Sequence, residues 1–258
     1  MLIAQITDMH VGLDIRVGSE RIDTAARLER AVAHLNRLDP RPDFVIATGD
    51  LTADGRPSEY ATLADLLGRL VMPFTLLPGN HDARASLCEA FPDMAWDGAG
   101  HEPAALFHEY DLEPLWLFAL DTLAPGEHHG ELGQDQLDWL DGRLGARNGR
   151  PSLVAMHHPP VAVGIPAFDA MNCTDGAALG AVLERHRGVE AVICGHVHRP
   201  VSLRWAGTVL HVTPSSSYQY GLAMRENEAL RPVDETPAVR LLAWLPETGL
   251  VSHLSPIP

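Results

Sequence analysis

The chain has 258 residues, of which 46% are hydrophobic and 21% charged, the make-up of an ordinary globular protein with enough apolar residues for a sizeable core. Its net charge is −15, from 19 lysines and arginines against 34 acidic residues, and it contains no basic run. Because a protein that grips a nucleic-acid backbone needs clustered cations, extended DNA or RNA is excluded as the expected partner.

The cysteines and the amino-terminal segment indicate in which cellular compartment the protein is expected. Cys88, Cys173 and Cys194 are far apart, odd in number and form no C-x-x-C motif, a pattern that predicts no disulfide framework and a reducing environment. The first residues lack the basic region and long apolar stretch of a secretion signal, and no segment approaches the roughly 18–20 apolar residues of a membrane span. We therefore expect a cytoplasmic protein with no membrane partner.

Apolar runs and amphipathic segments alternate along the first 194 residues. In chain order the pattern predicts a strand at 2–7, a helix at 21–38, a strand at 44–48, a helix at 58–70 and a strand at 74–77. It continues with a strand at 115–120, a helix at 134–144, a strand at 153–156, a helix at 176–187 and a strand at 191–194. Ser58 stands where the second helix would be capped. Strands that alternate with helices predict βαβ units and a layered α/β core.

The last quarter of the chain has a different pattern. Residues 201–205 and 208–212 predict a hairpin, and residues 239–244 and 250–254 predict two further strands around a turn. The polar segment 214–237 between them is expected to be a loop, an arm or a cap. No repeat or linker stands out, so we interpret residues 1–258 as a single domain.

Metal-capable side chains directly follow several of the predicted strands. They are Asp8-x-His10, Gly49-Asp50, Gly79-Asn80-His81-Asp82, His157-His158 and Gly195-His196-x-His198. In an open α/β sheet, functional sites gather at the carboxyl ends of the strands. We therefore expect these distant residues to meet in space.

The spacing within these motifs has geometric consequences. Asp8 and His10 are two residues apart, so in an extended chain their side chains point to the same side, as do those of His196 and His198. Such a pair can chelate one ion or flank two neighbouring ions. The glycines at 49, 79 and 195 are expected to let the backbone turn sharply where it leaves the sheet.

The side-chain types indicate which metals would bind. Imidazole, carboxylate and amide groups without thiolate suit Mn²⁺, Fe or Zn²⁺ better than a structural cysteine–zinc site. The candidate ligands are too many for one tetrahedral ion but enough for two ions that share a carboxylate; they are Asp8, His10, Asp50, Asn80, His157, His196 and His198. Two ions about 3.5–4 Å apart can clamp a phosphoryl group and bind a hydroxide poised for in-line attack. The sequence thus predicts two divalent ions per chain, Mn, Fe or Zn, with Co as a substitute in vitro.

The ordered set D-x-H, G-D, G-N-H-D, H and G-H-x-H, which spans residues 8 to 198, resembles the signature of calcineurin-like metallophosphoesterases. The wider context is similar to the branch that contains glycerophosphodiesterases and class III cyclic-nucleotide phosphodiesterases. The shared cues are G-D-L-T from residue 49, L-P-G-N-H-D from 77, H-H-P-P from 157 and C-G-H-V-H from 194. The resemblance implies a four-layer α-β-β-α sandwich of two mixed sheets flanked by helices.

The resemblance also implies two sets of metal ligands. The first ion is expected to be held by Asp8, His10, Asp50 and His198. Asp50 is expected to bridge to the second ion, which is completed by Asn80, His157 and His196. Family position favours His157 over the adjacent His158 as the ligand.

The expected catalytic residues are Asp50, Asn80 and His81. His81 matches the family's histidine that faces the scissile phosphate and is proposed to protonate the leaving oxygen, a role that suits the pKa of imidazole. Asn80 and His81 are adjacent, so they are expected to point in different directions. The sequence leaves two roles open for Asp82: it either orients His81 or caps a helix that starts at residue 83.

Two residues are expected to contact the substrate. Tyr218 stands where some relatives place a substrate-facing loop residue, and Arg16 lies in the loop after His10, where it meets either phosphate or solvent. Relatives form dimers and larger assemblies, so a homo-oligomer is expected.

The motifs depart from other branches of the family. Ser/Thr protein phosphatases continue the G-D motif into Asp-Arg-Gly, and purple acid phosphatases place a tyrosine ligand where Ala53 stands. With these branches set aside, the expected activity is hydrolysis of a small phosphodiester by a metal-bound hydroxide. The candidate substrates are glycerophosphodiesters, cyclic nucleotides and phosphonate monoesters. The alternatives are a phosphomonoesterase of the same fold, a nuclease, and a metal-binding scaffold without catalysis.

Overall fold

Two β-sheets form the centre of the molecule in the computed structural model, which describes residues 1–94, 96 and 105–258. The first sheet has the order β15 (Gly249–Pro256), β14 (Ala238–Leu245), β1 (Leu2–Ile6), β4 (Phe44–Thr48) and β5 (Phe74–Leu77). The second has the order β10 (Val201–Trp205), β11 (Thr208–Val212), β9 (Val189–Cys194), β8 (Ser152–Ala155), β7 (Trp116–Ala119) and β6 (His108–Asp111).

Both sheets are mixed. Strands β1, β4 and β5 are parallel, while β14 and β15 are antiparallel to their neighbours. In the second sheet β7, β8, β9 and β11 are parallel, and the edge strands β6 and β10 are antiparallel to their partners. Because β1 pairs with β14, the first and last parts of the chain share one sheet. A single domain over residues 1–258 remains our interpretation.

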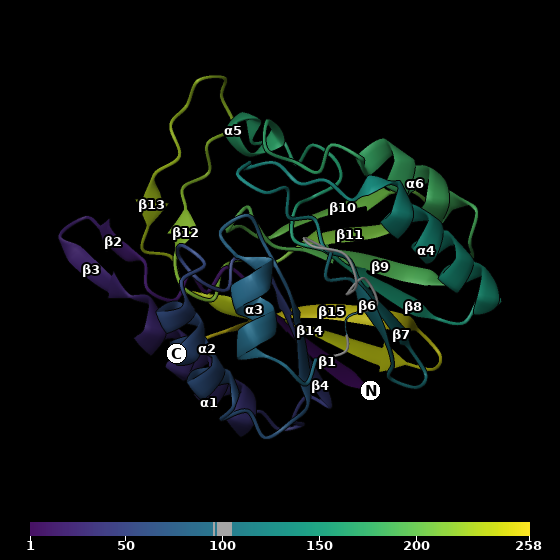
Figure 1. Cartoon of the computed structure of the whole chain (residues 1–258), viewed down its shortest axis with the longest axis horizontal. Helices are drawn as coiled ribbons and strands as arrows, with labels where there is room; N and C mark the ends of the chain where they lie inside the picture. Colours follow the sequence, from purple (N-terminus) through teal and green to yellow (C-terminus); the bar gives the residue numbers. More distant parts are fainter. Residues whose placement is uncertain (95, 97–104) are drawn as a thin grey trace.

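Helices cover the outer face of each sheet, as Figure 1 shows. Helices α1 (Thr24–Arg37), α2 (Pro57–Leu67) and α3 (Arg84–Ala90) lie on the first sheet, and α4 (Gly133–Ala146) and α6 (Gly176–Glu184) lie on the second. The short helix α5 (Pro166–Asp169) lies in the loop after β8. Since the parallel strands end at the same edges of these sheets, the loops that follow them are brought together.

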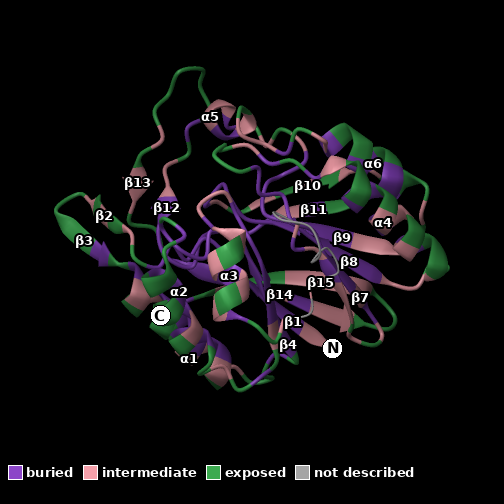
Figure 2. Cartoon of the chain, in the orientation of Figure 1, coloured by how far each residue is buried: buried purple, intermediate pink, exposed green. Residues whose placement is uncertain are grey.

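Apolar side chains alternate between the layers. Along β4, Val45 packs with the helices of the first sheet, whereas Ile46 packs between the two sheets against residues such as Leu117 and Ile193. Leu140 and Leu179 belong to a third cluster, between the second sheet and its helices. Figure 2 shows buried residues concentrated in the strands and exposed residues on the outer helices. The four-layer α-β-β-α arrangement is therefore confirmed.

The predicted strands are present, but the start of the first helix was wrong. Residues Glu20–Asp23 form strand β3, which pairs with β2 (Asp14–Val17), and α1 begins only at Thr24. Asp23 caps this helix, since its carboxylate accepts a hydrogen bond from the Ala26 amide. The capping role expected for Ser58 was also wrong, because α2 begins at Pro57 with Arg56 as its N-cap. Proline suits the first helical position because its fixed φ is already helical.

The segment 214–237 divides into two parts. Residues 214–219 are buried, and exposed side chains such as Leu222 and Met224 begin only after Tyr220. The segment contains one short pairing, between β12 (Gln219–Tyr220) and β13 (Pro232–Val233), and its outer loop protrudes from the molecule (Figure 1). Among the described residues, no helix has the length and apolar character needed to cross a membrane.

Candidate active site

The loops that follow β1, β4, β8 and β9 are hydrogen-bonded to one another at the carboxyl ends of their strands. The amide of Asp8 donates to the carbonyl of Gly49 at 3.1 Å, and the amide of His10 donates to that of Asp50 at 2.9 Å. The Gly195 amide donates to the His157 carbonyl at 3.0 Å, which connects the loops of the second sheet. The expected meeting of distant motifs at one edge therefore occurs.

Asp50 lies between two groups of buried side chains. Ligand atoms of Asp8, His10 and His198 lie within 4.8 Å of one another, and so do those of His157, His158 and His196. Asp50 belongs to mixed groups with residues of both. The two histidines of the G-H-x-H motif thus flank neighbouring groups instead of chelating at one point.

The carboxylate of Asp50 reaches both groups. Its Oδ2 lies 3.5 Å from His10 Nε2, and its Oδ1 lies 3.3 Å from His157 Nε2. On the His10 side, His198 Nε2 is 3.1 Å from His10 Nε2 and 3.4 Å from Asp8 Oδ1. Two oxygens of one carboxylate that face different ligand groups have the arrangement of a bridging ligand.

Backbone carbonyls orient the imidazoles. The Nδ1 of His157 donates to the carbonyl of Thr48, and the Nδ1 of His198 donates to that of Tyr218, both at 2.8 Å. A proton on Nδ1 leaves Nε2 with a free lone pair directed into the cluster, as in histidines that bind metals. The Nε2 atoms of His157 and His196 are buried without a hydrogen-bond partner. Buried nitrogens without a partner are costly, so this set of nitrogens and carboxylates fits a bound cation.

The backbone at the expected ligand positions is not extended, which corrects the geometry expected for the D-x-H and G-H-x-H motifs. The φ angles are 53° at Asp8, 46° at His10, 47° at Asp50, 70° at His196 and 53° at His198. Residues other than glycine rarely adopt this left-handed backbone conformation, which costs on the order of 1–3 kcal/mol of conformational energy per residue. The loops therefore hold strained conformations at the residues that converge.

The motif glycines serve two different purposes. Gly49 has a φ of 88°, so it turns the chain as expected. Gly79 and Gly195 are not among the glycines with positive φ, and what they supply is space. A Cβ on Gly79 would lie 2.3 Å from Asp50 Oδ1, and one on Gly195 would lie 2.7 Å from Asp8 Oδ2.

Burial and charge set the protonation of the cluster. Burial lowers the pKa of His10 to about 3, and burial together with nearby His157 lowers the pKa of His196 to about 3. Burial opposes the charged form of Asp50, but His157 and His10 outweigh it and hold the pKa of that carboxyl well below its usual value. Neutral His10 and His196 beside ionised Asp50 have the protonation states that metal ligands need. Burial opposes the charged form of His157, but Asp50 and Asp8 outweigh it and raise its pKa to about 9, so a bound cation would take the place of that proton.

Asn80 and His81 point in different directions, as expected for adjacent residues. Asn80 Oδ1 lies 3.1 Å from the Nε2 of His158, next to the group that contains His157. The His81 ring meets the His10 ring edge-on at 4.7 Å, and its Nδ1 donates to the Ala53 carbonyl at 2.8 Å. Burial lowers the pKa of His81, but Asp50 and the Ala53 carbonyl outweigh it, and the net pKa is raised.

Of the two roles left open for Asp82, the helix cap is wrong, and the orientation of His81 stays a prediction. Its carboxylate accepts hydrogen bonds from the amides of Leu51, Thr52 and Gly79 and from the Tyr60 hydroxyl, and the N-cap of α3 is Ala83. Asp82 therefore fastens the loop after β4 to the loop after β5. Asp50 and Asn80 belong to the two loops that these hydrogen bonds join.

The two expected substrate contacts lie in different surroundings. Tyr218 is 5% exposed, and its ring packs on the rings of His198 at 4.6 Å and His10 at 5.6 Å. Arg16 is exposed on β2, paired in register with Arg21 of β3. A substrate-binding role for either residue stays a prediction.

Several supporting residues were missed at the sequence level. Ser215 Oγ donates to the carbonyl of Asp8 at 2.8 Å, which fastens the start of the 214–237 segment beneath the cluster. Asp121 lies two residues after the end of β7, is buried, and pairs with Arg84, 2.6 Å from its Nε. A polar residue directly after the apolar run 115–120 is the signal that could have identified Asp121, because the other site residues occupy the same position after their strands.

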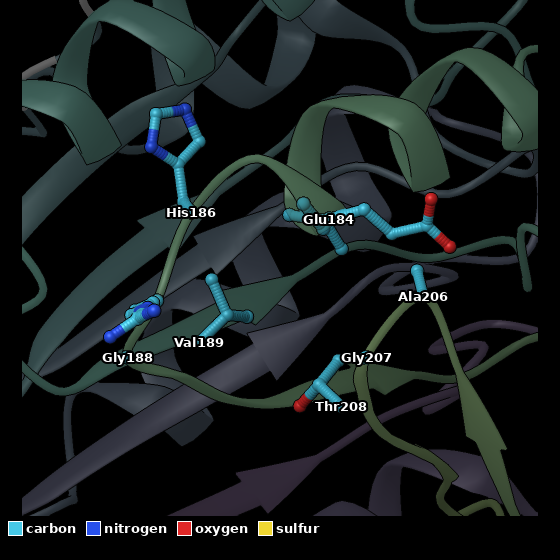
Figure 3. A pocket seen from close by; sticks show the side chains of 9 residues that line it. Glu184, His186, Gly188, Val189, Ala206, Gly207 and Thr208 are labelled. Carbon is cyan, nitrogen blue, oxygen red and sulfur yellow. The ribbon is translucent and has the colours of Figure 1, made fainter.

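A separate cavity of about 380 Å³ lies outside the cluster (Figure 3). It is lined by His186, Val189 and Thr208 among others. Val189 begins strand β9, whereas His196 and His198 follow its other end. This cavity is therefore not part of the candidate active site.

Comparison with known proteins agrees with this geometry. Residues 1–200 match the family model of the calcineurin-like phosphoesterases. The chain is 31% identical to a probable glycerophosphodiester phosphodiesterase of Arcobacter nitrofigilis, over 99% of this chain and 93% of the relative. It is 30% identical to the 3′,5′-cyclic adenosine monophosphate phosphodiesterase of Escherichia coli K12, over 84% and 77% of the two chains.

A solved structure has the same fold. A dimetal phosphatase from Danio rerio superimposes with a TM-score of 0.68 at 16% identity, covering 100% of this chain and 99% of that one. The match to the family model, the two enzyme relatives and the buried His/Asp cluster lead to the same conclusion. The chain belongs to the calcineurin-like phosphoesterase family.

Proposed function

We propose that this protein is a phosphodiesterase that holds two divalent metal ions and hydrolyses small phosphodiesters. The observation that carries the proposal is the position of Asp50, whose two carboxylate oxygens face histidines of two separate ligand groups. A site for a single ion would not need a carboxylate directed both ways.

The two ions would have distinct ligands. One would be held by Asp8, His10, Asp50 and His198, the other by Asp50, Asn80, His157 and His196. Bound divalent ions polarise phosphoryl oxygens and lower the pKa of coordinated water, which supplies a nucleophile at neutral pH. The donor set of nitrogens and oxygens suits Mn, Fe or Zn, with Co as a substitute.

Asn80 and His81 would act on the substrate itself. The Asn80 side chain lies beside the second ligand group, and the His81 ring lies beside His10 and Asp50. The Ala53 carbonyl accepts from His81 Nδ1 and fixes the ring, and the raised pKa favours the doubly protonated imidazole, which would donate its Nε2 proton to a leaving alkoxide. Hydrogen-bond donors that face the developing charge stabilise the transition state.

The substrate class follows from charge and from the relatives. A net charge of −15 does not suit a long polyanion. One relative is named as acting on glycerophosphodiesters and another on cyclic adenosine monophosphate. Glycerophosphodiesters and cyclic nucleotides are therefore the proposed substrates, with phosphonate monoesters as a further candidate. We also propose that the protein acts in the cytoplasm and forms a homo-oligomer.

A paired assay tests this function. Metal-free protein is reconstituted with Mn²⁺ and given bis-p-nitrophenyl phosphate and p-nitrophenyl phosphate in parallel. We expect turnover of the diester only with metal, and at a higher rate than the monoester. A preference for the monoester would favour a phosphomonoesterase, cleavage of plasmid DNA would favour a nuclease, and no turnover with two bound ions would favour a scaffold.

A further inference from the structure

A row of three side chains, of which Thr122 and His158 are buried and Asn80 is half-buried, ends on the oxygen of Asn80. The Thr122 hydroxyl lies 2.8 Å from Nδ1 of His158, and Nε2 of His158 lies 3.1 Å from Asn80 Oδ1. Thr122 and His158 have no exposed surface. His158 comes from the loop after β8 and Thr122 from the loop after β7, so the row connects two neighbouring strand ends to the G-N-H-D motif.

The contacts in this row determine where each proton lies. Asn80 Oδ1 carries no hydrogen, so His158 Nε2 must donate to it. With its one proton on Nε2, the neutral imidazole has a lone pair on Nδ1, which accepts from the Thr122 hydroxyl, and Thr122 Oγ1 in turn accepts the backbone amide of His158 at 3.4 Å. The hydrogen bonds thus run in one direction, from the Thr122 hydroxyl to the imidazole and from the imidazole to the Asn80 oxygen.

This direction matters because an asparagine amide has two different ends. The oxygen can bind a cation, whereas the NH₂ group can only donate. The N–H of His158 can donate only to the oxygen of the Asn80 amide. If the amide were rotated, its NH₂ group would face this N–H and two donors would meet. A carbonyl oxygen has two lone pairs, so one can accept from His158 while the other remains available.

We propose that His158, held in one tautomer by Thr122, is a positioning residue that presents the oxygen of Asn80 to the second metal ion. This inference rests on the proposed function, in which Asn80 is a ligand. It assigns His158 a role different from that of its neighbour His157, whose Nε2 faces Asp50.

Close packing prevents the His158 ring from moving to compensate. A Cβ on Gly130 would lie 2.6 Å from His158 Nδ1, so only glycine leaves room for the ring there. The rings of His157 and His196 close the other sides, with centroids at 4.8 Å and 4.6 Å. The orientation of Asn80 therefore depends on the hydrogen bonds of a ring that cannot turn.

The first test uses a matched pair at position 122. Thr122→Val keeps the shape but removes the hydroxyl, so the proton can move to Nδ1 and leave Nε2 as an acceptor. Thr122→Ser keeps the hydroxyl. Metal-free proteins are titrated with Mn²⁺, and free Mn²⁺ is followed by electron paramagnetic resonance. We expect the Kd of the second ion to rise about 10-fold or more in Thr122→Val and to stay within a few-fold of wild type in Thr122→Ser, with the Kd of the first ion unchanged in both.

The second test separates a positioning role from direct ligation by His158. His158→Gln keeps an N–H donor near Asn80, whereas His158→Phe keeps the ring without a donor. We expect the glutamine variant to retain second-ion affinity within about 10-fold and the phenylalanine variant to lose about 10- to 100-fold. Thermal melts of the metal-free variants identify any that do not fold.

The outcomes are distinct. Equal losses in the glutamine and phenylalanine variants would mean that the imidazole itself binds metal and would overturn the positioning role. Wild-type second-ion affinity in both Thr122→Val and His158→Phe would also overturn it, with the proposed function intact. A wild-type protein that binds fewer than two ions would overturn the proposed function and this inference with it.

Discussion

Asp50 and His157 lie close together across the two sheets: Asp50 Oδ1 is 3.3 Å from His157 Nε2, while the Nδ1 of the same imidazole is held by the Thr48 carbonyl. Asp50 follows β4 of the first sheet and His157 follows β8 of the second. The candidate site therefore exists only where both sheets end together.

Removing the charge of Asp50 should remove the second ion. Asp50→Asn keeps the size but replaces one oxygen by an NH₂ group that cannot bind a cation. We expect one ion or none per chain by elemental analysis and a fall in phosphodiesterase activity of about 100-fold or more. Asp14→Asn, at an exposed carboxylate paired with Arg21, is the control and should keep both ions. Equal metal content in the two variants would contradict the bridging role.

Replacing His81 should affect poor leaving groups most. His81→Gln removes the imidazole that we propose as the proton donor, and general acids contribute about 10²- to 10⁴-fold. An alkoxide needs a proton to depart, whereas p-nitrophenolate does not. We expect kcat to fall by about 100-fold or more for a glycerophosphodiester and by much less for bis-p-nitrophenyl phosphate. Equal losses on the two substrates would mean that His81 acts only by stabilising charge.

The glycine of the G-N-H-D motif should tolerate no side chain. A Cβ on Gly79 would lie 2.3 Å from the Asp50 amide nitrogen, so Gly79→Ala must displace Asp50 and should cost about 1–3 kcal/mol of unfolding free energy. Gly142 lies within α4 with open space around it, and Gly142→Ala should stabilise by about 0.5–1 kcal/mol. Urea unfolding of the metal-free proteins measures both. Stabilisation by Gly79→Ala would show that the backbone there is not crowded.

Protonation of His108 should contribute to acid unfolding. Burial lowers the pKa of His108 from its usual 6.5 to about 4, and its Nε2 lies 2.7 Å from the Thr75 hydroxyl. The folded state therefore binds this proton less readily than the unfolded state. The contribution of the neutral ring is complete above pH 6.5 and is lost as the pH falls towards 4.

The matching measurement is the pH dependence of unfolding in metal-free protein. The difference between the two pKa values corresponds to about 3 kcal/mol at most. We expect the free energy of unfolding of His108→Gln to decline less than that of wild type between pH 7 and pH 4. His10 and His196 titrate in both proteins, so they cancel in the comparison. Parallel curves would contradict the assignment.

The parts of the fold that could be predicted are those where local pattern and burial coincide. Strand β4 is a continuous apolar run because both of its faces are buried. Strand β6 was missed, since its sequence HEYD lies at a sheet edge and carries no apolar pattern. The hairpin of β2 and β3 was missed for a similar reason, because residues 14–17 and 20–23 are mostly polar and exposed.

The candidate site likewise contains residues that a local sequence pattern reveals and contacts that it does not. The metal-capable residues were found because each directly follows an apolar strand, a position visible in sequence. The contacts that support them join loops far apart in the chain, such as Asp82 with Leu51 and His158 with Asn80, and no local pattern encodes those pairs. The left-handed conformations of Asp8 and His10 were also missed, because strain at non-glycine residues is imposed by the surrounding structure.

Anomalous diffraction from crystals grown with MnCl₂ tests the central claim most directly. We predict two manganese peaks about 3.5–4 Å apart, one beside Asp8, His10 and His198 and the other beside Asn80, His157 and His196, with the Asp50 carboxylate between them. A single peak, or peaks away from Asp50, would contradict the account.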